Sequence, residues 1–388
     1  MHSRLPLAFA IILIAFNLRL VLTSVAPVLQ EIMRDTGLSA TGASVLTTLP
    51  VLCLGLFAPA GPWVARRLGS ERTLVLLIAA ITLGTALRGF GSIAALLIGG
   101  TLAGIGIGMG NVLVPGLLNR DFADHASLMT GAYTMTLCLG AAFAARFTAP
   151  LRDAFDGAWA QALAAWALPG ALAMAVAAVV LTPRGTNRPA PMRPARGLWR
   201  DPVAWQITLY MSLQSALAYI VFGWLAPILR DRGDTAATAG AVVSVCILGQ
   251  VAAALPAPLI AGRMRSQSLP AGGSLVVTGV SFLLLVLAPL EWQWLLAITL
   301  GLGMGASLAL GVMLMVIRAR DSHAAAGVST MSQTVGYTLA AAGPLVVGAL
   351  HDASGDWTGA AIAATVVCTG SAIAGWLAGR PRFVNAQG

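Results

Sequence analysis

The chain has 388 residues, of which 58% are hydrophobic and 10% charged, and its mean hydropathy is +0.84. This composition excludes an ordinary soluble domain and predicts an all-α polytopic membrane protein. The formal net charge of +9 does not indicate nucleic-acid binding, because the basic residues lie in short loops between apolar runs.

All 23 basic residues are arginine, which excludes a lysine-dependent phosphate-binding loop and Schiff-base chemistry. We expect no metal site and no cofactor, because the cysteines lie inside apolar runs and form neither a CxxC motif nor a metal-ligand spacing with histidine. These cysteines are Cys53, Cys138, Cys246 and Cys368.

The first apolar run, residues 5–32, carries a charge where a membrane-spanning helix should carry none. At about 1.5 Å per residue, a helix that enters the bilayer near Pro6 reaches the midplane next to Arg19. An arginine at that depth costs roughly 2.5 to 3.5 kcal/mol on insertion scales. We expect Arg19, with its neighbour Asn17, to face a polar cavity and bind substrate. The alternative is a structural arginine that carbonyls and interhelical hydrogen bonds neutralise.

Apolar runs of about 18 residues or more, separated by Arg, Asp, Pro and Gly clusters, predict twelve transmembrane helices. They lie near residues 6–31, 41–65, 73–92, 93–117, 128–150, 159–182, 203–229, 238–261, 269–290, 292–317, 324–350 and 357–379.

The arginines predict the orientation of these helices. If the amino terminus is cytoplasmic, sixteen arginines fall in cytoplasmic segments, four fall outside and three fall within spans. The positive-inside rule then places both termini in the cytoplasm, in a protein of the inner membrane.

A polar linker, residues 183–201, divides the chain into two halves of six predicted spans, residues 1–182 and 202–388. The halves repeat at an offset of about 195 to 200 residues, which predicts two pseudo-symmetric six-helix halves. The matching residues include Ala26-Pro27 with Ala226-Pro227, and the glycine run from Gly104 to Gly110 with Gly301, Gly303 and Gly305.

The repeat also relates two polar residues. Arg19 lies eight residues before Pro27, and Tyr219 lies eight residues before Pro227. We expect Arg19 and Tyr219 to be pseudo-symmetry mates that face one another at the midplane across a central cavity.

Few other side chains inside the spans could bind a polar solute. Gln333 and Tyr337 are four residues apart and so share one helix face. The remaining candidates are Gln214 and Trp224 in the seventh span, Asn111 in the fourth and Tyr133 in the fifth. For the polar ones, the alternative is an interhelical hydrogen bond worth roughly 0.6 to 2 kcal/mol.

Three arginines are secondary candidates for gating or for a vestibule. Arg88 and Arg146 lie towards the outer ends of the third and fifth spans, where a side chain that reaches the headgroups is an adequate explanation. Arg318 closes the tenth span and is expected to be an anchor or gate residue. The glycine runs are expected to be packing surfaces without a ligand.

No Asp or Glu lies in the middle of a predicted span, and the four histidines lie at span ends or in loops. A proton-coupled pump usually has a buried titratable group within the membrane. A positive charge at the midplane favours an anion, or a dipolar solute with a strong acceptor, as the bound small molecule. Any proton coupling would then run through the acidity of the substrate or through a peripheral group.

These residues resemble the CynX/NimT branch of the major facilitator superfamily, the cyanate and 2-nitroimidazole transporters, along essentially the whole chain. The segments that carry the resemblance include Asn17-Leu18-Arg19, the glycine run ending in Asn111, Trp224-Leu225-Ala226-Pro227, Met331 to Tyr337, and Gly355-Asp356-Trp357. The resemblance implies the major facilitator fold with 12 transmembrane helices, and a transport activity. Arg66-Arg67 stand where that superfamily usually has an acidic residue, which argues against ordinary charge-relay gating, and Leu20 stands where a proline is usual.

We therefore expect a monomeric secondary or facilitative transporter that moves a small anionic or polar solute by alternating access. The alternative in the same fold is an exporter of apolar drugs, in which Trp224 and Met331 line the pocket and Arg19 is structural. An enzyme is not expected, because the HExxH and GxSxG motifs are missing and no His, Asp or Glu lies at mid-span to act as a base.

Overall fold

The computed structural model describes residues 5–122, 125–181, 197–320 and 322–384, and these ranges are helical, without a strand. The helices before the predicted linker are α1 (Leu5–Thr23), α2 (Leu29–Thr36), α3 (Ala40–Phe57), α4 (Ala60–Leu68), α5 (Ser70–Leu87), α6 (Ile93–Asp121), α7 (Ala126–Ala154), α8 (Trp159–Ala165) and α9 (Ala167–Val180). Those after it are α10 (Pro202–Asp231), α11 (Ala236–Ala254), α12 (Pro256–Gly262), α13 (Ser268–Leu287), α14 (Gln293–Ile317), α15 (Ser322–Ala340), α16 (Ala342–Ser354) and α17 (Thr358–Ala378). Short 3₁₀ turns are η1 (Ala26–Val28), η2 (Arg88–Phe90), η4 (Leu198–Arg200) and η5 (Leu290–Trp292).

Twelve segments of the described chain are long and apolar enough to cross a bilayer, and each corresponds to a predicted span. Several consist of two helices, as α1 and α2 do, because Pro27 lacks the N–H that would continue α1 and the chain passes through η1. The second span is shorter than predicted. It was expected over residues 41–65, but α3 ends at Phe57 and a new helix, α4, begins after Pro59.

The chain forms two compact units. Unit 1 consists of Met1–Ser39, Val45–Pro191 and Ala236–Ser244, and unit 2 of Ala40–Ser44, Met192–Thr235 and Val245–Gly388. The first residues of α3 thus belong to unit 2, and those of α11 belong to unit 1. Residues 183–196 of the predicted linker lie outside the described residues, and the division into residues 1–182 and 202–388 stays a prediction.

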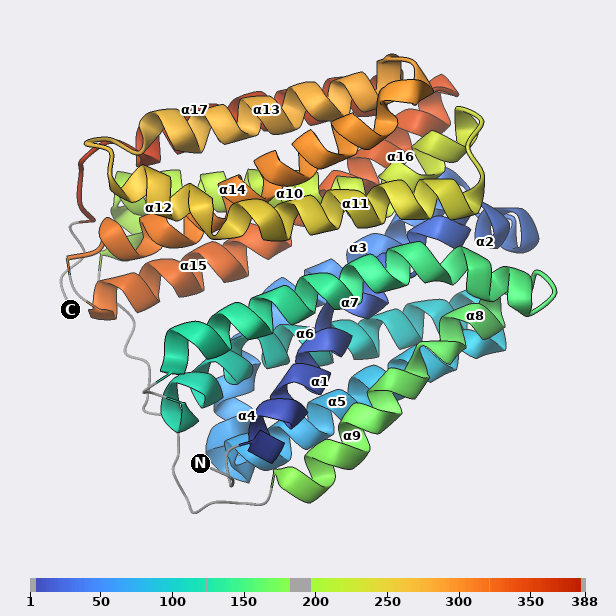
Figure 1. Cartoon of the computed structure of the whole chain (residues 1–388), viewed down its shortest axis with the longest axis horizontal. Helices are drawn as coiled ribbons and strands as arrows, with labels where there is room; N and C mark the ends of the chain where they lie inside the picture. The colour runs from blue at the N-terminus through green and yellow to red at the C-terminus, as the bar shows by residue number, and fades with distance from the viewer. Residues whose placement is uncertain (1–4, 123–124, 182–196, 321, 385–388) are drawn as a thin grey trace. The chain divides into compact units, whose positions relative to one another are not determined.

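In unit 1, α1 packs along α7 and α5 packs along α6 (Figure 1). Glycines of α6 allow the close approach of two neighbouring helices. A Cβ atom on Gly104 would lie 2.7 Å from Pro50 Cα in α3, and one on Gly106 would lie 2.9 Å from the Leu77 carbonyl oxygen in α5. The predicted packing role of this glycine run is confirmed.

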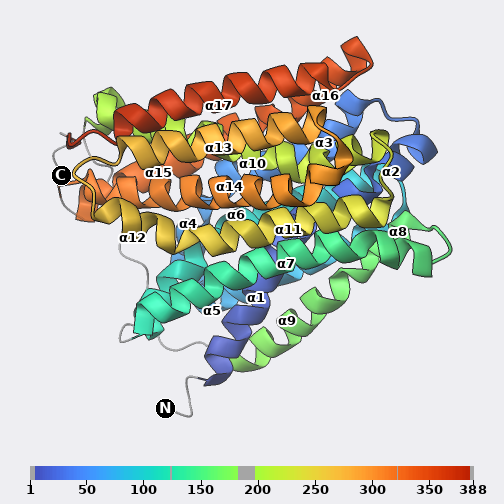
Figure 2. The same cartoon turned by 45° about the horizontal axis from the view of Figure 1, so that its top comes forward.

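In unit 2, α13 packs along both α14 and α17, and α10 packs along α15 (Figure 2). The glycines of α14 repeat the arrangement of α6. A Cβ atom on Gly305 would lie 2.6 Å from Gln250 Cα in α11, and one on Gly303 would lie 2.9 Å from the Ser274 carbonyl oxygen in α13. The predicted packing role is confirmed here as well.

Each unit also joins its first span to its last through a tryptophan. In unit 1, Trp159 Nε1 at the start of α8 donates a hydrogen bond to Asp35 Oδ2 at 2.9 Å. In unit 2, Trp357 Nε1, just before α17, donates to Asp231 Oδ2 at 2.9 Å. Both bonds are charge-assisted, so they fix the end of one helix against the beginning of another.

Candidate functional site

Arg19 lies near the end of the fourth turn of α1, and its side chain is partly buried. The segment around it packs closely on two helices of unit 1. A Cβ atom on Gly110 of α6 would lie 3.0 Å from Leu18 Cδ2, and Gly140 of α7 lies against the backbone of Phe16. Because glycine lets these backbones approach, α6 and α7 hold the part of α1 that carries Arg19.

Asn17 is 2% exposed and binds backbone carbonyl groups. Its Nδ2 donates to the Leu13 oxygen at 2.8 Å and to the Pro169 oxygen of α9 at 3.3 Å. The carboxamide therefore fixes α1 to α9, which favours the interhelical alternative for this residue. A substrate-binding role for Asn17 stays a prediction.

Two further candidates of unit 1 lie together. The Tyr133 hydroxyl of α7 donates to Asn111 Oδ1 of α6 at 3.3 Å. Tyr133 is 6% exposed and Asn111 is partly buried. Asn111 directly follows Gly110, which packs against Leu18, so the pair lies close to the contact of α6 with the Arg19 segment. The structure thus brings Tyr133 and Asn111 together, while their position beside the Arg19 side chain stays a prediction.

In unit 2 the structure brings Tyr219 and Tyr337 together. Their ring centroids are 6.3 Å apart, with an angle of 68° between the ring planes. Tyr219 is 7% exposed, and Tyr337 is partly buried on α15. One turn earlier on α15, Gln333 Nε2 donates to Ser329 Oγ at 3.1 Å. The predicted pairing of Tyr219 with Arg19 joins residues of different units and stays a prediction.

The other two candidates of α10 are buried among neighbouring side chains. Trp224 is 1% exposed, and its Nε1 donates to the Pro344 oxygen at 3.0 Å. Gln214 is 4% exposed, and its Nε2 donates to Ser215 Oγ at 2.9 Å. Met331 is 3% exposed within a hydrophobic cluster of unit 2. A drug pocket lined by Trp224 and Met331 stays the alternative, and the polar solute site stays a prediction.

Arg88 does not extend towards the headgroups, so that interpretation of the sequence was wrong. It is 2% exposed, and its Nη1 donates to the Val21 oxygen at 3.1 Å and to Ser24 Oγ at 3.4 Å. Because α1 ends at Thr23, the Val21 carbonyl lies in its last turn, where carbonyl groups need donors from elsewhere and a positive charge is favourable. A vestibule role for Arg88 stays a prediction.

The other two arginines differ in burial. Arg146 is partly buried, with its guanidinium carbon 5.5 Å from the centroid of the Phe147 ring. Arg318 is 5% exposed, donates to the Gly379 oxygen at 2.9 Å and to the Ala378 oxygen at 3.2 Å, and also binds Gln267 Oε1. Burial lowers the pKa of Arg318. These bonds anchor the end of α14 to the end of α17, while gating by Arg146 or Arg318 stays a prediction.

The sequence analysis missed an ionic cluster in unit 1. Arg120 Nη2 lies 2.6 Å from Glu71 Oε1, and Arg120 Nε lies 2.8 Å from Asp121 Oδ1. Hydrogen bonds with Asp121, and then with Glu71, raise the pKa of Arg120. The signal for this cluster was the repeat, because Glu71 and Arg120 match Gln267 and Arg318 at the offset of about 195 to 200 residues.

Comparison with known proteins gives a consistent family. The family model "Major Facilitator Superfamily" matches residues 7–342. The chain is 34% identical to a 2-nitroimidazole transporter of Escherichia coli (strain K12), over 99% of this chain and 98% of the relative. It is 28% identical to the cyanate transport protein CynX of the same strain, over 89% of this chain and 90% of the relative. The crystal structure of a bacterial homolog to the human lysosomal transporter Spinster superposes with a TM-score of 0.80 and 17% identity, covering 100% of both chains.

Proposed function

Because the chain belongs to the Major Facilitator Superfamily, in the family of the 2-nitroimidazole and cyanate transporters, we propose that it moves a small anionic or strongly polar solute across the membrane by alternating access. Membership of this family makes the chain a multi-pass membrane transporter and not an enzyme. The solute class, the site and the access mechanism are the parts that we propose.

The observation that carries the proposal is the position of Arg19 in α1, beside the contact with the α6 segment that bears Asn111. A guanidinium group is planar and presents paired N–H donors, which match the two oxygens of a carboxylate or nitro group and can also engage a small linear anion. Asn111 and Tyr133 are already joined by a hydrogen bond, so they can act as one polar wall next to Arg19.

From the sequence repeat, we expect the second half of the chain to orient the solute by hydrogen bonds and to add no second charge. Tyr219 and Tyr337 offer two hydroxyl groups on rings that touch edge to face, and Gln333 offers an amide one turn away. Such groups donate and accept hydrogen bonds without adding a second net charge. The bound solute would therefore carry about one negative charge, or a strong dipole, matched by a single arginine.

One short segment at the start of α3 bears on the proposed motion. Ala40–Ser44 of α3 belongs to unit 2, where Asp352 accepts hydrogen bonds from the backbone N–H groups of Ala40 at 2.9 Å and Thr41 at 2.8 Å. The rest of α3 belongs to unit 1. Motion between the units would require α3 to bend after Ser44 or its first turn to detach from Asp352.

We also propose the orientation and the assembly state. The distribution of arginines favours both termini in the cytoplasm and location in an inner membrane. We propose a monomer, with any coupled proton carried through the acidity of the solute.

Uptake of radiolabelled solute into proteoliposomes tests the proposal, with cyanate and 2-nitroimidazole as probes. Arg19→Gln and Arg19→Lys are both expected to abolish uptake while the protein is still produced and purified, because lysine lacks the planar pair of donors. Arg34→Gln is the matched control. Arg34 lies in the same apolar segment of the structure, Leu5–Thr36, but its side chain is 74% exposed and pairs with Asp35, so uptake should be unchanged. Wild-type uptake by Arg19→Gln would overturn the proposal.

A further inference from the structure

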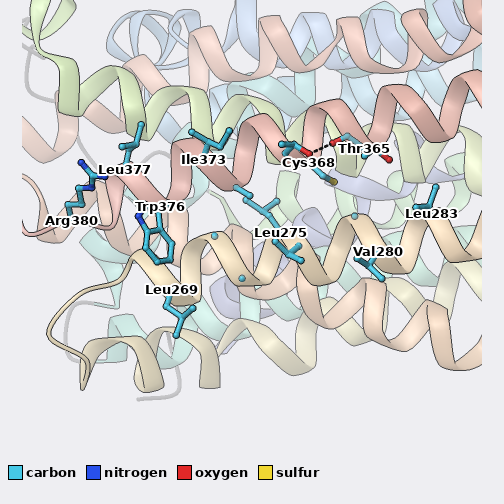
Figure 3. Close-up of a pocket in the computed structure, with 16 residues that line it drawn as sticks. Leu269, Leu275, Val280, Leu283, Thr365, Cys368, Ile373, Trp376, Leu377 and Arg380 are labelled. Atoms are coloured by element: carbon cyan, nitrogen blue, oxygen red, sulfur yellow. Dashed lines mark hydrogen bonds between the residues drawn. The ribbon is translucent and has the colours of Figure 1, made fainter.

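A pocket of about 650 Å³ lies in unit 2 between α13 and α17, and no candidate of the solute site lines it (Figure 3). Its walls are almost entirely apolar. The largest exposed side chains along them are Leu269, Val276 and Val280 on α13, and Ile373 and Trp376 on α17. In a helix pair that crosses a bilayer, such an exposed apolar groove is in contact with lipid acyl chains.

The groove is open because several of its lining positions on α13 are glycines, which have no side chain. Gly272, Gly273 and Gly279 line it, and a Cβ atom on Gly273 would meet no atom within 4 Å. By contrast, a Cβ atom on Gly279 would touch Cys368 of α17 at 2.9 Å. The two helices therefore meet at Gly279, and the space at Gly273 is open to an occupant.

One end of the groove is positively charged. Arg380 and Trp376 lie together at that end, as Figure 3 shows. Three further arginines occur in the adjoining segments, Arg263 and Arg265 before α13 and Arg382 after α17. No Asp or Glu occurs in residues 256–268 or 376–384.

This charged end is also held in place by hydrogen bonds between the two helices. The Gln267 N–H donates to the Gly379 oxygen at 3.0 Å, and Ser268 Oγ donates to the Trp376 oxygen at 2.7 Å. The start of α13 and the end of α17 are thus fixed together, so a ligand there meets a preformed site. A preformed site binds without having to order the chain first.

The dimensions of the groove fit one lipid. From Leu269 to Leu283 the groove follows α13 for about 21 Å, which exceeds half of the roughly 30 Å hydrocarbon core. Tryptophan is typical of the depth at which headgroups meet acyl chains, and basic pockets between transmembrane helices bind anionic headgroups.

We propose that this groove binds an anionic phospholipid, with its phosphate at the Arg380 end and one acyl chain along α13 and α17 over Gly273. The charge at one end selects the headgroup, and the apolar length holds the chain. The site is independent of the proposed solute site, because it needs neither Arg19 nor any residue of unit 1.

Native mass spectrometry of the purified full chain, titrated with phosphatidylglycerol or with phosphatidylcholine of the same acyl chains, tests this site. The wild type should retain phosphatidylglycerol at lower concentrations than phosphatidylcholine. Arg380→Gln should weaken phosphatidylglycerol binding about fivefold, equivalent to about 1 kcal/mol, and leave phosphatidylcholine binding unchanged. Gly273→Leu should remove the tight site, because its side chain would fill the open space.

Gly131→Leu is the matched control, since Gly131 is an exposed glycine of α7 and a Cβ atom there meets no atom within 4 Å. It should bind phosphatidylglycerol as the wild type does. If Gly273→Leu fails to fold, the lipid binding of Arg380→Gln alone tests the proposal. The Arg380 side chain is exposed, so its replacement should not affect folding. Equal binding of the two lipids, or wild-type phosphatidylglycerol binding by Arg380→Gln, would overturn the proposal. So would loss of a dimer in Gly273→Leu without a change in lipid binding, because the occupant would then be a second copy of the chain.

Discussion

In unit 1 the glycines of α6 meet α3 and α5, and in unit 2 the glycines of α14 meet α11 and α13 in the same order. Both units also join a tryptophan near the start of the last span to an aspartate near the end of the first. These positions repeat because they set how closely two backbones approach, and only a few residue types satisfy that requirement.

The two units differ in their charges. The end of α6 in unit 1 carries the ionic contact of Arg120 with Glu71, whereas the equivalent end of α14 carries Arg318 bound to the neutral amide of Gln267. In the sequence repeat, the position of Arg19 in the first half corresponds to that of Tyr219 in the second half. The comparison teaches that the two units share their packing positions but differ at these polar positions, and the proposed solute site relies on one of those differences, Arg19.

The largest expected effect tests whether the tryptophan contacts are equivalent. Trp357→Ala should cost about 3 kcal/mol of unfolding free energy, since it removes a large buried side chain. Trp159→Ala should cost less, because Trp357 also stacks on His351 with 4.0 Å between ring centroids and lies 5.3 Å from Trp224. Thermal unfolding in detergent measures both variants. Equal losses of unfolding free energy in the two variants would show that the ring contacts of Trp357 with His351 and Trp224 do not contribute to stability.

The next effect tests the glycine contacts. Gly104→Ala should cost about 2 kcal/mol, because its Cβ atom would lie 2.7 Å from Pro50 Cα and the helices must move apart. Gly116→Ala in the same helix is the control. Its Cβ atom meets no atom within 4 Å, so the higher helix propensity of alanine should leave stability unchanged or raised. A Gly104→Ala protein as stable as the wild type would contradict the packing account.

A smaller effect is expected from exchanging the contacts at the ends of α6 and α14. Glu71→Gln gives unit 1 the amide found in unit 2 and should cost about 1 kcal/mol, since Arg120 keeps its bonds to Asp121. Gln267→Glu should cost about as much, because a carboxylate can pair with Arg318 but no longer donates to the Ala261 and Met264 oxygens, which both accept from Gln267 Nε2. Unfolding at low and high salt distinguishes the two arrangements, and an unfolded Glu71→Gln protein would show that the units are not interchangeable here.

The smallest effect concerns the start of the last span. Asp356 Oδ1 accepts a hydrogen bond from the Thr358 N–H at 2.9 Å, and this bond is the main cause of the lowered pKa of Asp356. The lowered pKa means that the contribution to stability is present above the unfolded pKa of about 3.9 and is lost as the pH falls through the folded pKa. Asp356→Ala should therefore melt slightly below the wild type at neutral pH. The two melting temperatures should converge in acid, and a constant difference would rule out the carboxylate as the cause.

Much of the fold could be predicted because hydropathy and the repeat are local properties of the sequence. The twelve spans and the packing role of Gly104 and Gly305 followed from them. The direction of a side chain did not follow, because depth along a helix says nothing about which neighbour it faces. Arg88 was therefore assigned to the headgroups, although it binds the last turn of α1.

Within the candidate site, pairs on one helix were easier to predict than contacts between helices. The shared face of Gln333 and Tyr337 followed from their spacing of four residues. The hydrogen bond of Tyr133 with Asn111 joins residues 22 positions apart on different helices, so only the fold reveals it. The contact of Arg120 with Glu71 spans 49 positions, and the repeat matches these residues with Gln267 and Arg318 without indicating that either pair is in contact.

The central claim is that Arg19 binds the solute, and a thermal-shift screen of the purified protein tests it most directly. Cyanate, small carboxylates, 2-nitroimidazole and neutral apolar drugs are compared on the wild type and on Arg19→Gln. A ligand at 100 times its dissociation constant stabilises the folded state by about 2.7 kcal/mol. We predict that an anion or 2-nitroimidazole raises the melting temperature of the wild type and not that of Arg19→Gln. Stabilisation by neutral apolar compounds alone, equal in both proteins, would contradict the account and make Arg19 a structural residue.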